Sequence, residues 1–183
     1  MKNELRPALC SVAADEAASI RKRRGLVMNV LVFEVSGRNY GLEAENVIEM
    51  LPSVSLTPLP GSPSVIEGIF NLRGTIVSVL DIRVRFALPA KAVEHTDHLI
   101  VGSAGPRLVA IRADRAVGLS SLEISRPEGG DGASGLGEQL SGVATVPDGL
   151  LLVLNLQTFL SQAESAQLES AVAGTREVPG LVG

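Results

Sequence analysis

The sequence predicts a mainly β protein built from two small, similar modules that pack together. Residues 27–160 are dense in β-branched residues and turn signals, whereas the helical patterns among them are short. Stretches of the first half of the chain also recur in the second half, at a spacing too long for a solenoid. A chain of 183 residues with 45% hydrophobic residues can bury such a core without disulfides.

Charge and composition exclude several classes of partner. A net charge of −4, an isoelectric point near 5.2 and only 3% aromatic residues argue against nucleic acid, which requires a concentrated basic surface. The basic cluster "RKRRG" at residues 21–25 is interpreted as a solvated charge run. No apolar run approaches about 18 residues, so no direct membrane insertion is expected. The single cysteine, Cys10, and the lack of a signal-peptide pattern predict a cytoplasmic setting.

The first predicted elements are a tail, a β-hairpin and a short helix. Residues 1–26 are Ala-rich and charged with a thin apolar stripe, and they are interpreted as an N-terminal tail. Residues 30–35 alternate apolar and polar, which is the period of a half-buried strand, and "SGRN" followed by "YGLEA" indicates a hairpin. The segment "EAENVIEML" at residues 43–51 is predicted to be a short helix or helical turn that ends at Pro52.

Further strands and a C-terminal helix follow. The strands are expected at residues 69–72, 75–82, 98–102, 108–113, 143–146 and 150–156. From Ser161 onward, "SQAESAQLESAVAG" is typical of a short amphipathic helix with Ala163, Ala166 and Leu168 on one side. Residues 162–183 are therefore assigned to a C-terminal helix or tail. Because neither end carries a strong apolar stripe, removing residues 1–26 and 165–183 is expected to cost little stability.

The internal repeat is visible without gaps. Moved by 74 residues, "GIFNLRGTIVSVLDIRVRF" (68–86) aligns with "GVATVPDGLLLVLNLQTFL" (142–160), which places Asp81 opposite Asn155. Moved by 69 residues, "GLEAENVIEML" (41–51) aligns with "AIRADRAVGLS" (110–120). Most core positions match in residue type, which predicts two copies of one small β module.

The expected modules span about residues 27–90 and 97–161 and are joined near residues 89–97. Each has several short strands with Gly/Pro turns, which fits a small closed or nearly closed barrel. A module of this size is marginal alone, so the two are expected to pack together and to leave a groove between them. The sequence leaves open whether the modules exchange a strand.

The same stretches carry the pattern of a known family. "VFEVSGRNYGLEAENVIEML", "TPLPGSPSVIEGIFNLRGTIVSVLDIRVRF", "LVAIRADRAVGL" and "LSGVATVPDGLLLVLNLQTFL" resemble the CheW family, the adaptor of bacterial chemotaxis arrays, over about residues 28–161. The "GxxNLRGxIxxxxDxRxxF" pattern is the most specific part of the match. The resemblance implies a CheW-like domain at residues 27–161, made of two SH3-like five-stranded β-barrel modules packed together, with short helices.

The resemblance also implies a function. It is that of a non-enzymatic adaptor that couples the tip of a methyl-accepting chemoreceptor to the regulatory domain of a CheA-type histidine kinase. Such an adaptor is cytoplasmic and is recruited to membrane-associated receptor arrays. Two alternatives stay open: a CheW-like scaffold of another chemosensory pathway, such as one for surface motility, and a small-ligand-binding β protein that uses the groove.

Four residues match the receptor-facing positions of the family. Carried over one by one, the receptor-binding residues are Val47, Glu49, Gly68 and Arg73. Arg73 lies at a predicted hairpin turn where Gly74 takes the unusual backbone angles, so its side chain is free to reach a partner's carboxylate or carbonyl. Glu49 is expected on the outer face of the predicted helical turn. At Gly68, a side chain is expected to hold a partner helix off the surface. The alternative for both charged residues is a solvated side chain without a partner.

Kinase contacts are not assigned to residues, although the family places them on the outer edges of the barrels. Gln139 stands where members of the family often have an aromatic residue, which is a departure on the kinase side. Asp81 interrupts a predicted buried strand, and we expect it to cap the following turn or to pair with Arg83 or Arg85, because an unpaired acid there is costly.

No pattern in the sequence indicates catalysis, a metal or a cofactor. His95 and His98 have a spacing that can bind metal, but no further ligands accompany them. Cys10 has no neighbouring histidine. The loop "GGDGASGLG" lacks the lysine and the strand–turn–helix setting of a phosphate loop. We therefore expect no enzyme activity, no metal and no cofactor.

Overall fold

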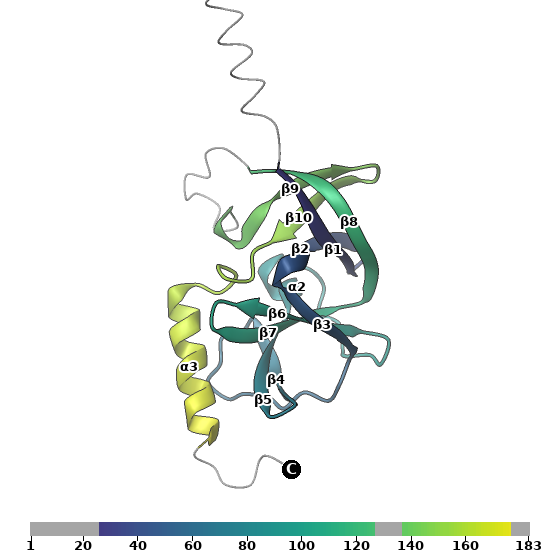
Figure 1. Ribbon diagram of the computed structural model, residues 1–183. Helices are drawn as coiled ribbons and strands as arrows, with labels where there is room; N and C mark the ends of the chain where they lie inside the picture. Colours follow the sequence, from purple (N-terminus) through teal and green to yellow (C-terminus); the bar gives the residue numbers. More distant parts are fainter. Residues whose placement is uncertain (1–25, 127–136, 177–183) are drawn as a thin grey trace, which may run out of the picture.

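The computed structural model describes residues 26–126 and 137–176. The N-terminal tail with its basic run and Cys10, the glycine-rich loop at 127–136 and residues 177–183 lie outside the described part. The described chain is mainly β, as predicted (Figure 1).

The described strands, in chain order, are β1 (Leu26–Val35), β2 (Arg38–Glu43), β3 (Val47–Pro52), β4 (Ile66–Leu72), β5 (Thr75–Leu80), β6 (His98–Ala104), β7 (Arg107–Ala113), β8 (Arg115–Ser125), β9 (Leu140–Val146) and β10 (Gly149–Leu154). The helical segments are η1 (Ala44–Asn46), α2 (Ile82–Arg85), η2 (Gly137–Gln139) and α3 (Gln162–Arg176).

The strands form two sheets of five. One is a closed barrel with the strand order β1-β2-β10-β9-β8, and it forms the upper part of the molecule in Figure 1. The other, called the second sheet below, has the order β3-β6-β7-β5-β4 and lies beneath the barrel. The second sheet therefore has β3 and β4 as its end strands, whereas the closed barrel has no free edge.

Neither sheet is confined to one of the expected ranges, 27–90 and 97–161. The barrel combines the hairpin β1–β2 from the first repeat with β8, β9 and β10 from the second. The second sheet combines the hairpin β6–β7 from the second repeat with β3, β4 and β5 from the first. The exchange that the sequence left open does occur, and what is exchanged is a whole hairpin.

The repeat itself is visible in the strand pairing. Each sheet contains one parallel pair, β5 with β7 and β10 with β2. Ser78 pairs with Val109 in the second sheet, and Leu152 pairs with Tyr40 in the barrel. Ser78 and Leu152 are 74 positions apart, and Tyr40 and Val109 are 69 apart, which are the two offsets of the sequence repeat. The aligned segments therefore occupy equivalent places in the two sheets.

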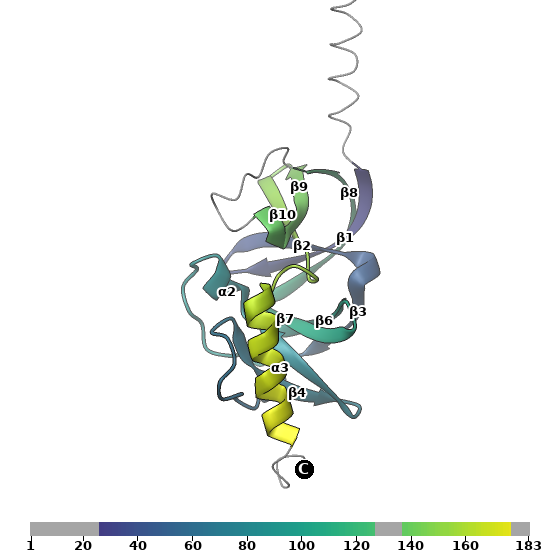
Figure 2. The ribbon, with the colours of Figure 1, turned by 90° about the vertical axis from the view of Figure 1, so that its left-hand side faces the viewer.

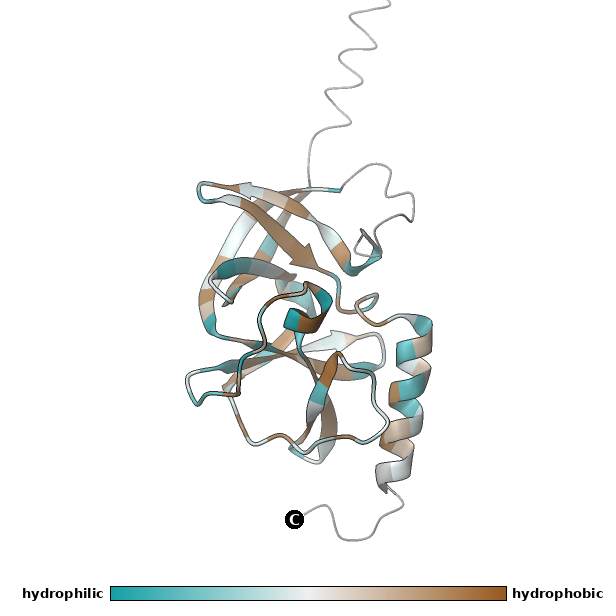
Figure 3. Cartoon of the chain, turned by 180° about the vertical axis from the view of Figure 1, so that it is seen from behind, coloured by the Kyte–Doolittle hydropathy of each residue, from teal (hydrophilic) through white to brown (hydrophobic). Residues whose placement is uncertain are grey.

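A shared apolar core joins the two sheets. Phe33 and Leu42 from the barrel and Ile100 and Ile111 from the second sheet belong to one buried cluster. The barrel and the second sheet also have small cores of their own. Strand β1 supplies both kinds of core, since Val30 lies in the barrel's own cluster and Phe33 in the shared one. The interface between the two sheets is therefore filled with apolar side chains. Figure 3 shows long hydrophobic stretches along the strands.

Helix α3 packs along the second sheet, as both ribbon views show (Figures 1 and 2). Ser161 begins it with a capping box: its hydroxyl accepts a hydrogen bond from the Glu164 amide, and its amide donates to the Glu164 carboxylate. Leu168 is 2% exposed and belongs to the shared core. The expected stripe is only partly right, because Ala163 and Ala166 are exposed. Because Leu168 packs in the core, the structure gives no support to the expectation that residues 165–183 can be removed at little cost in stability.

Strands β3 and β8 were not predicted from the sequence. Within residues 43–51, only Ala44–Asn46 is helical, and the remainder belongs to β3, paired with β6. The β-branched pair Val47–Ile48 favours the extended chain, and pairing with β6 outweighs the local helical pattern. Strand β8 was missed because most of its residues are exposed, so it lacks regular alternation. The expectation for Asp81 is confirmed: its Oδ1 accepts from the Arg83 amide at 2.9 Å and begins α2.

Candidate protein-interaction site

Arg73 lies at the tip of the β4–β5 hairpin. Leu72 pairs with Thr75, so Arg73 and Gly74 form a two-residue turn, and their φ angles of 50° and 89° are both left-handed. This is the type I′ geometry, which matches the twist of the flanking strands. The Asn71 Oδ1 accepts a hydrogen bond from the Gly74 amide at 2.7 Å and stabilises the turn. Both Arg73 and Gly74 thus take a left-handed conformation, whereas the sequence analysis expected this conformation for the glycine alone.

The Arg73 guanidinium forms a bidentate ion pair with Glu49. Its two terminal nitrogens donate to the two carboxylate oxygens at 3.1 and 2.9 Å. The Arg73 side chain is 77% exposed and that of Glu49 is 25% exposed. Glu49 lies on β3, so the pair connects the tip of the β4–β5 hairpin to the end strand at the opposite side of the second sheet. The two charged residues that the sequence singled out are therefore in direct contact.

The other two predicted residues lie in the same sheet but are less accessible. Val47 begins β3, is half-buried and packs against the shared core. Gly68, on β4, is buried beneath the connection from β3: a Cβ there would lie 2.9 Å from the Thr57 carbonyl oxygen and 3.1 Å from the Leu56 Cβ. A side chain at Gly68 would displace this connection before it met a partner. Gly68→Gln is therefore no clean probe of partner binding.

Two exposed apolar residues flank Glu49 and were not found from the sequence. Ile48 and Met50 are 54% and 45% exposed, on a strand where Val47, Glu49 and Leu51 are half-buried. The signal was present as an alternation along "VIEML", but it was interpreted as part of a helix. Strand β3 thus exposes two apolar side chains, Ile48 and Met50, which flank the ion-paired Glu49 in sequence, and such exposed apolar residues suit a protein partner.

The remaining sequence candidates do not add to this site. Gln139 is buried, and its backbone oxygen accepts from the Asn155 amide, so it offers little surface to a kinase. His95 is exposed and His98 is half-buried. Within residues 26–126 and 137–176, no group of three or more His, Cys, Asp or Glu side chains is placed to hold a metal ion. The helices of this part of the chain include none long and apolar enough to cross a membrane.

Comparisons with known proteins agree on one family. The model of the CheW-like domain matches residues 29–164. Protein FrzA of Myxococcus xanthus is 34% identical over 77% of this chain and 88% of its own length. Chemotaxis protein CheW of Klebsiella aerogenes is 29% identical over 76% of this chain and 86% of its own length. In fold, the chain resembles the crystal structure of the scaffolding protein TtCheW from Thermoanaerobacter tengcongensis, with a TM-score of 0.66 and 23% identity, over 76% of this chain and 96% of that one.

Proposed function

This chain belongs to the CheW-like domain family, and from that membership we propose that it couples the tip of a methyl-accepting chemoreceptor to the regulatory domain of a CheA-type histidine kinase. Proteins of this family are scaffolds without catalytic activity, so the chain is a chemotaxis-type scaffold and not an enzyme. The proposal places it in the cytoplasm, recruited to membrane-associated receptor arrays.

The exposed face of β3 carries the proposal for the receptor. Ile48 and Met50 offer apolar surface, and Glu49, their neighbour on the same strand, holds the Arg73 guanidinium in an ordered position at the tip of the β4–β5 hairpin. An amphipathic receptor helix can bury its apolar side chains on such an exposed apolar surface. Arg73 then fixes the register of the helix by a directional, charge-assisted hydrogen bond to a carboxylate or carbonyl.

The scaffold needs a second surface for the kinase domain, and we place it on the outer faces of the two sheets, away from the exposed residues of β3. Binding two partners at once raises their effective concentration toward each other, so each contact can be weak on its own. No chemical step at this protein is required for the signal.

Replacing Arg73 tests the receptor site. Arg73→Glu removes the charge-assisted hydrogen bond and places two like charges beside each other, so we expect receptor binding to weaken by about 2 kcal/mol, or roughly 30-fold. Binding to the isolated kinase regulatory domain should stay within about threefold. Calorimetry with a receptor-tip fragment and with the kinase domain measures both affinities.

Arg115→Glu is the matched control. Arg115 is 66% exposed and pairs with Glu34 at 2.7 Å, much as Arg73 pairs with Glu49, but it lies in the barrel. The Arg115→Glu variant should leave receptor binding unchanged. Equal losses for Arg73→Glu and Arg115→Glu, or equal losses toward both partners with an intact fold, would contradict the proposed site. Receptor and kinase fragments from different chemosensory systems, used in the same assay, would assign the pathway.

A further inference from the structure

The described chain passes between the barrel and the second sheet at three places. The first passage is η1, which leads from β2 to β3. The second is Asp114, the one residue between β7 and β8. The third is the segment 155–161, which leads from β10 to α3 on the second sheet. Any rotation of one sheet against the other must change the backbone at these three passages.

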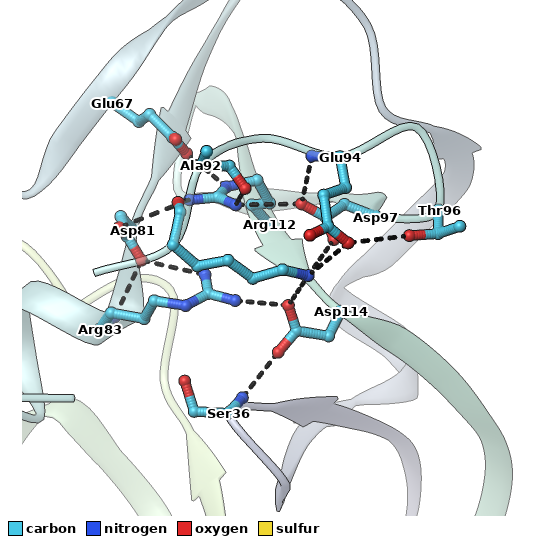
Figure 4. Close-up of polar contacts among 11 residues, drawn as sticks. Ser36, Glu67, Asp81, Arg83, Ala92, Glu94, Thr96, Asp97, Arg112 and Asp114 are labelled. Carbon is cyan, nitrogen blue, oxygen red and sulfur yellow. Dashed lines mark hydrogen bonds and ion pairs between the residues drawn. The ribbon is translucent and has the colours of Figure 1, made fainter. Parts of the chain in front are cut away.

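Asp114 binds both sheets at the second passage (Figure 4). On the barrel side, its amide donates to the Glu34 carbonyl at 2.9 Å, and its Oδ2 accepts from the Ser36 amide at 2.6 Å. On the other side, its Oδ1 accepts from the Arg83 guanidinium at 2.6 Å and from the Lys91 ammonium at 2.8 Å. One carboxylate thus holds the β1–β2 turn of the barrel against α2.

The one-turn helix α2 also binds the third passage. Arg85 donates to the Phe159 carbonyl at 3.0 Å and to the Glu164 carboxylate at 2.8 Å, and its guanidinium lies 5.5 Å from the Phe159 ring centre. Arg83 and Arg85, called the arginine clasp below, therefore each hold one of the passages between the sheets. Arg83 is 1% exposed, so its ion pair with Asp114 is shielded from water.

A chain of buried and partly buried ion pairs anchors this region to the second sheet. Lys91 also donates to Asp97 at 2.9 Å, and Asp97 accepts from Arg112 on β7 at 3.0 Å. Arg112 in turn donates to Glu67 on β4 at 2.7 Å. Figure 4 shows the side chains of Asp97, Arg112 and Glu67 close to one another. The clasp is thus tied through Asp114 and Lys91 to β4 and β7, and a shift of α2 would strain the network.

The first passage has no equivalent of the clasp. The sequence repeat relates Arg83 to Gln157 and Asp114 to Glu45, and both of these counterparts are exposed. Elsewhere the sheets meet through the shared apolar core, and apolar contacts are not directional. Charge-assisted hydrogen bonds prescribe both distance and angle, so the clasp can select one orientation that the core alone does not.

We propose that the arginine clasp fixes the orientation of the barrel relative to the second sheet, so that surfaces on the two sheets are presented in one geometry. This proposal does not require any particular partner. Its consequence for the scaffold rests on the proposed function: partners bound to different sheets would be held at a defined angle to each other.

Distances between spin labels can measure this orientation. In a Cys10→Ser background, labels are placed on exposed residues, Ser120→Cys in the barrel and Thr75→Cys in the second sheet. In the reference pair, both labels lie on exposed residues of the barrel, at Ser120→Cys and Thr145→Cys. Double electron–electron resonance gives the width of each distance distribution in the full chain.

Arg83→Gln and Arg85→Gln test the clasp, and Arg115→Gln, which loses an ion pair inside the barrel only, is the matched control. For either clasp variant, we expect the distance distribution between the labels on the two sheets to become about twofold wider, as for a loosened rigid-body contact. The distribution of the reference pair should stay unchanged. The control should leave both widths unchanged.

Unchanged widths in the folded clasp variants would overturn the proposal and assign the orientation to the apolar core. Equal broadening in Arg115→Gln would also overturn it, since that change removes no hydrogen bond of the clasp. If the buried Arg83→Gln variant fails to fold, Arg85→Gln decides the question, because this side chain is 19% exposed and its loss is easier to accommodate.

Discussion

Asp97 shows how a single buried carboxylate is stabilised in this protein. It is fully buried and accepts hydrogen bonds from the Lys91 ammonium, the Arg112 guanidinium and the Glu94 amide. Burial raises the pKa of the Asp97 carboxyl, but the hydrogen bonds from Lys91, the Glu94 amide and Arg112 outweigh it and hold the pKa below its ordinary value of 3.8. The folded state therefore strongly favours the charged form of Asp97.

The pKa of the Asp114 carboxyl is set by the same opposing effects. Burial raises its pKa, whereas hydrogen bonds from Lys91 and the Ser36 amide, with the charge of Arg83, bring the pKa below 3.8. Lys91 is shared by the two acids, and its own pKa lies above the ordinary value, first because of the hydrogen bond with Asp114 and then that with Asp97. The two acids and their cations form one coupled unit.

The depressed carboxyl pKa values predict a loss of stability in acid. As the pH falls below about 5, the unfolded chain takes up protons at these carboxyls before the folded protein does, so the free energy of unfolding decreases until the pH passes the low folded pKa values. For Asp97→Asn we expect about 3 kcal/mol lower stability at pH 7, because the buried Arg112 and the partly exposed Lys91 lose a charge partner, and a weaker pH dependence of the stability between about pH 5 and 3. Urea unfolding at several pH values measures both quantities.

Asp148→Asn, in the exposed β9–β10 turn, is the control and should keep the stability and the pH dependence of the unchanged protein. An Asp97→Asn variant with the same pH dependence as the unchanged protein would show that Asp97 does not contribute to the acid loss.

Individual residues of the site were only partly predictable from sequence. The pair Arg73 and Glu49 followed from the family pattern, but their mutual contact did not, since it joins residues 24 positions apart across an unpredicted strand. Gly68 was selected because a side chain there would hold a partner helix off the surface, but a side chain would first meet another part of this chain. The connection at Leu56–Thr57 covers it, and only the tertiary structure shows this.

Among the elements, β3 and β8 show where local patterns stop being informative. Both follow directly on a passage between the sheets, and each pairs with the hairpin of the other repeat. Their extended conformation depends on that pairing, which a local window of sequence does not contain. Strands that are buried without interruption over most of their length, such as β5 and β7, were predicted to within a few residues, because a short, largely apolar run between turn signals indicates a strand by itself.

Helix α3 gives the prediction at the element scale. Leu168 lies in the shared core, so Leu168→Ala should lower the free energy of unfolding by about 3 kcal/mol through lost burial and the cavity left behind. Leu150→Ala is the matched control, because Leu150 is 70% exposed and should cost less than about 0.5 kcal/mol. Chemical denaturation measures both. Similar small losses for the two variants would mean that α3 is dispensable, as the sequence alone suggested.

At the scale of the whole molecule, the hairpin exchange joins the two sequence repeats into one folded unit. The repeat offsets were readable from the chain, and they correctly predicted which segments are equivalent. The sequence did not reveal which hairpin pairs with which strands, because equivalent segments present the same pattern to either partner. The two parallel pairings, β5 with β7 and β10 with β2, determine this arrangement, and both join strands from different repeats.

The exchange predicts that neither half of the chain folds alone. A cut between Ala92 and Val93, in an exposed part of the connection, leaves each fragment with strands of both sheets and without the partners that complete them. Each fragment on its own should show little β signal in circular dichroism and no dispersed amide spectrum, since two or three strands without their neighbours are marginal in water. Mixed in equal amounts, the fragments should regain the spectrum of the intact chain, with a midpoint of unfolding that rises with concentration, as for any folded state formed by association. A fragment that folds alone would indicate that each repeat can close a sheet by itself, and the hairpin exchange would then not be required for folding.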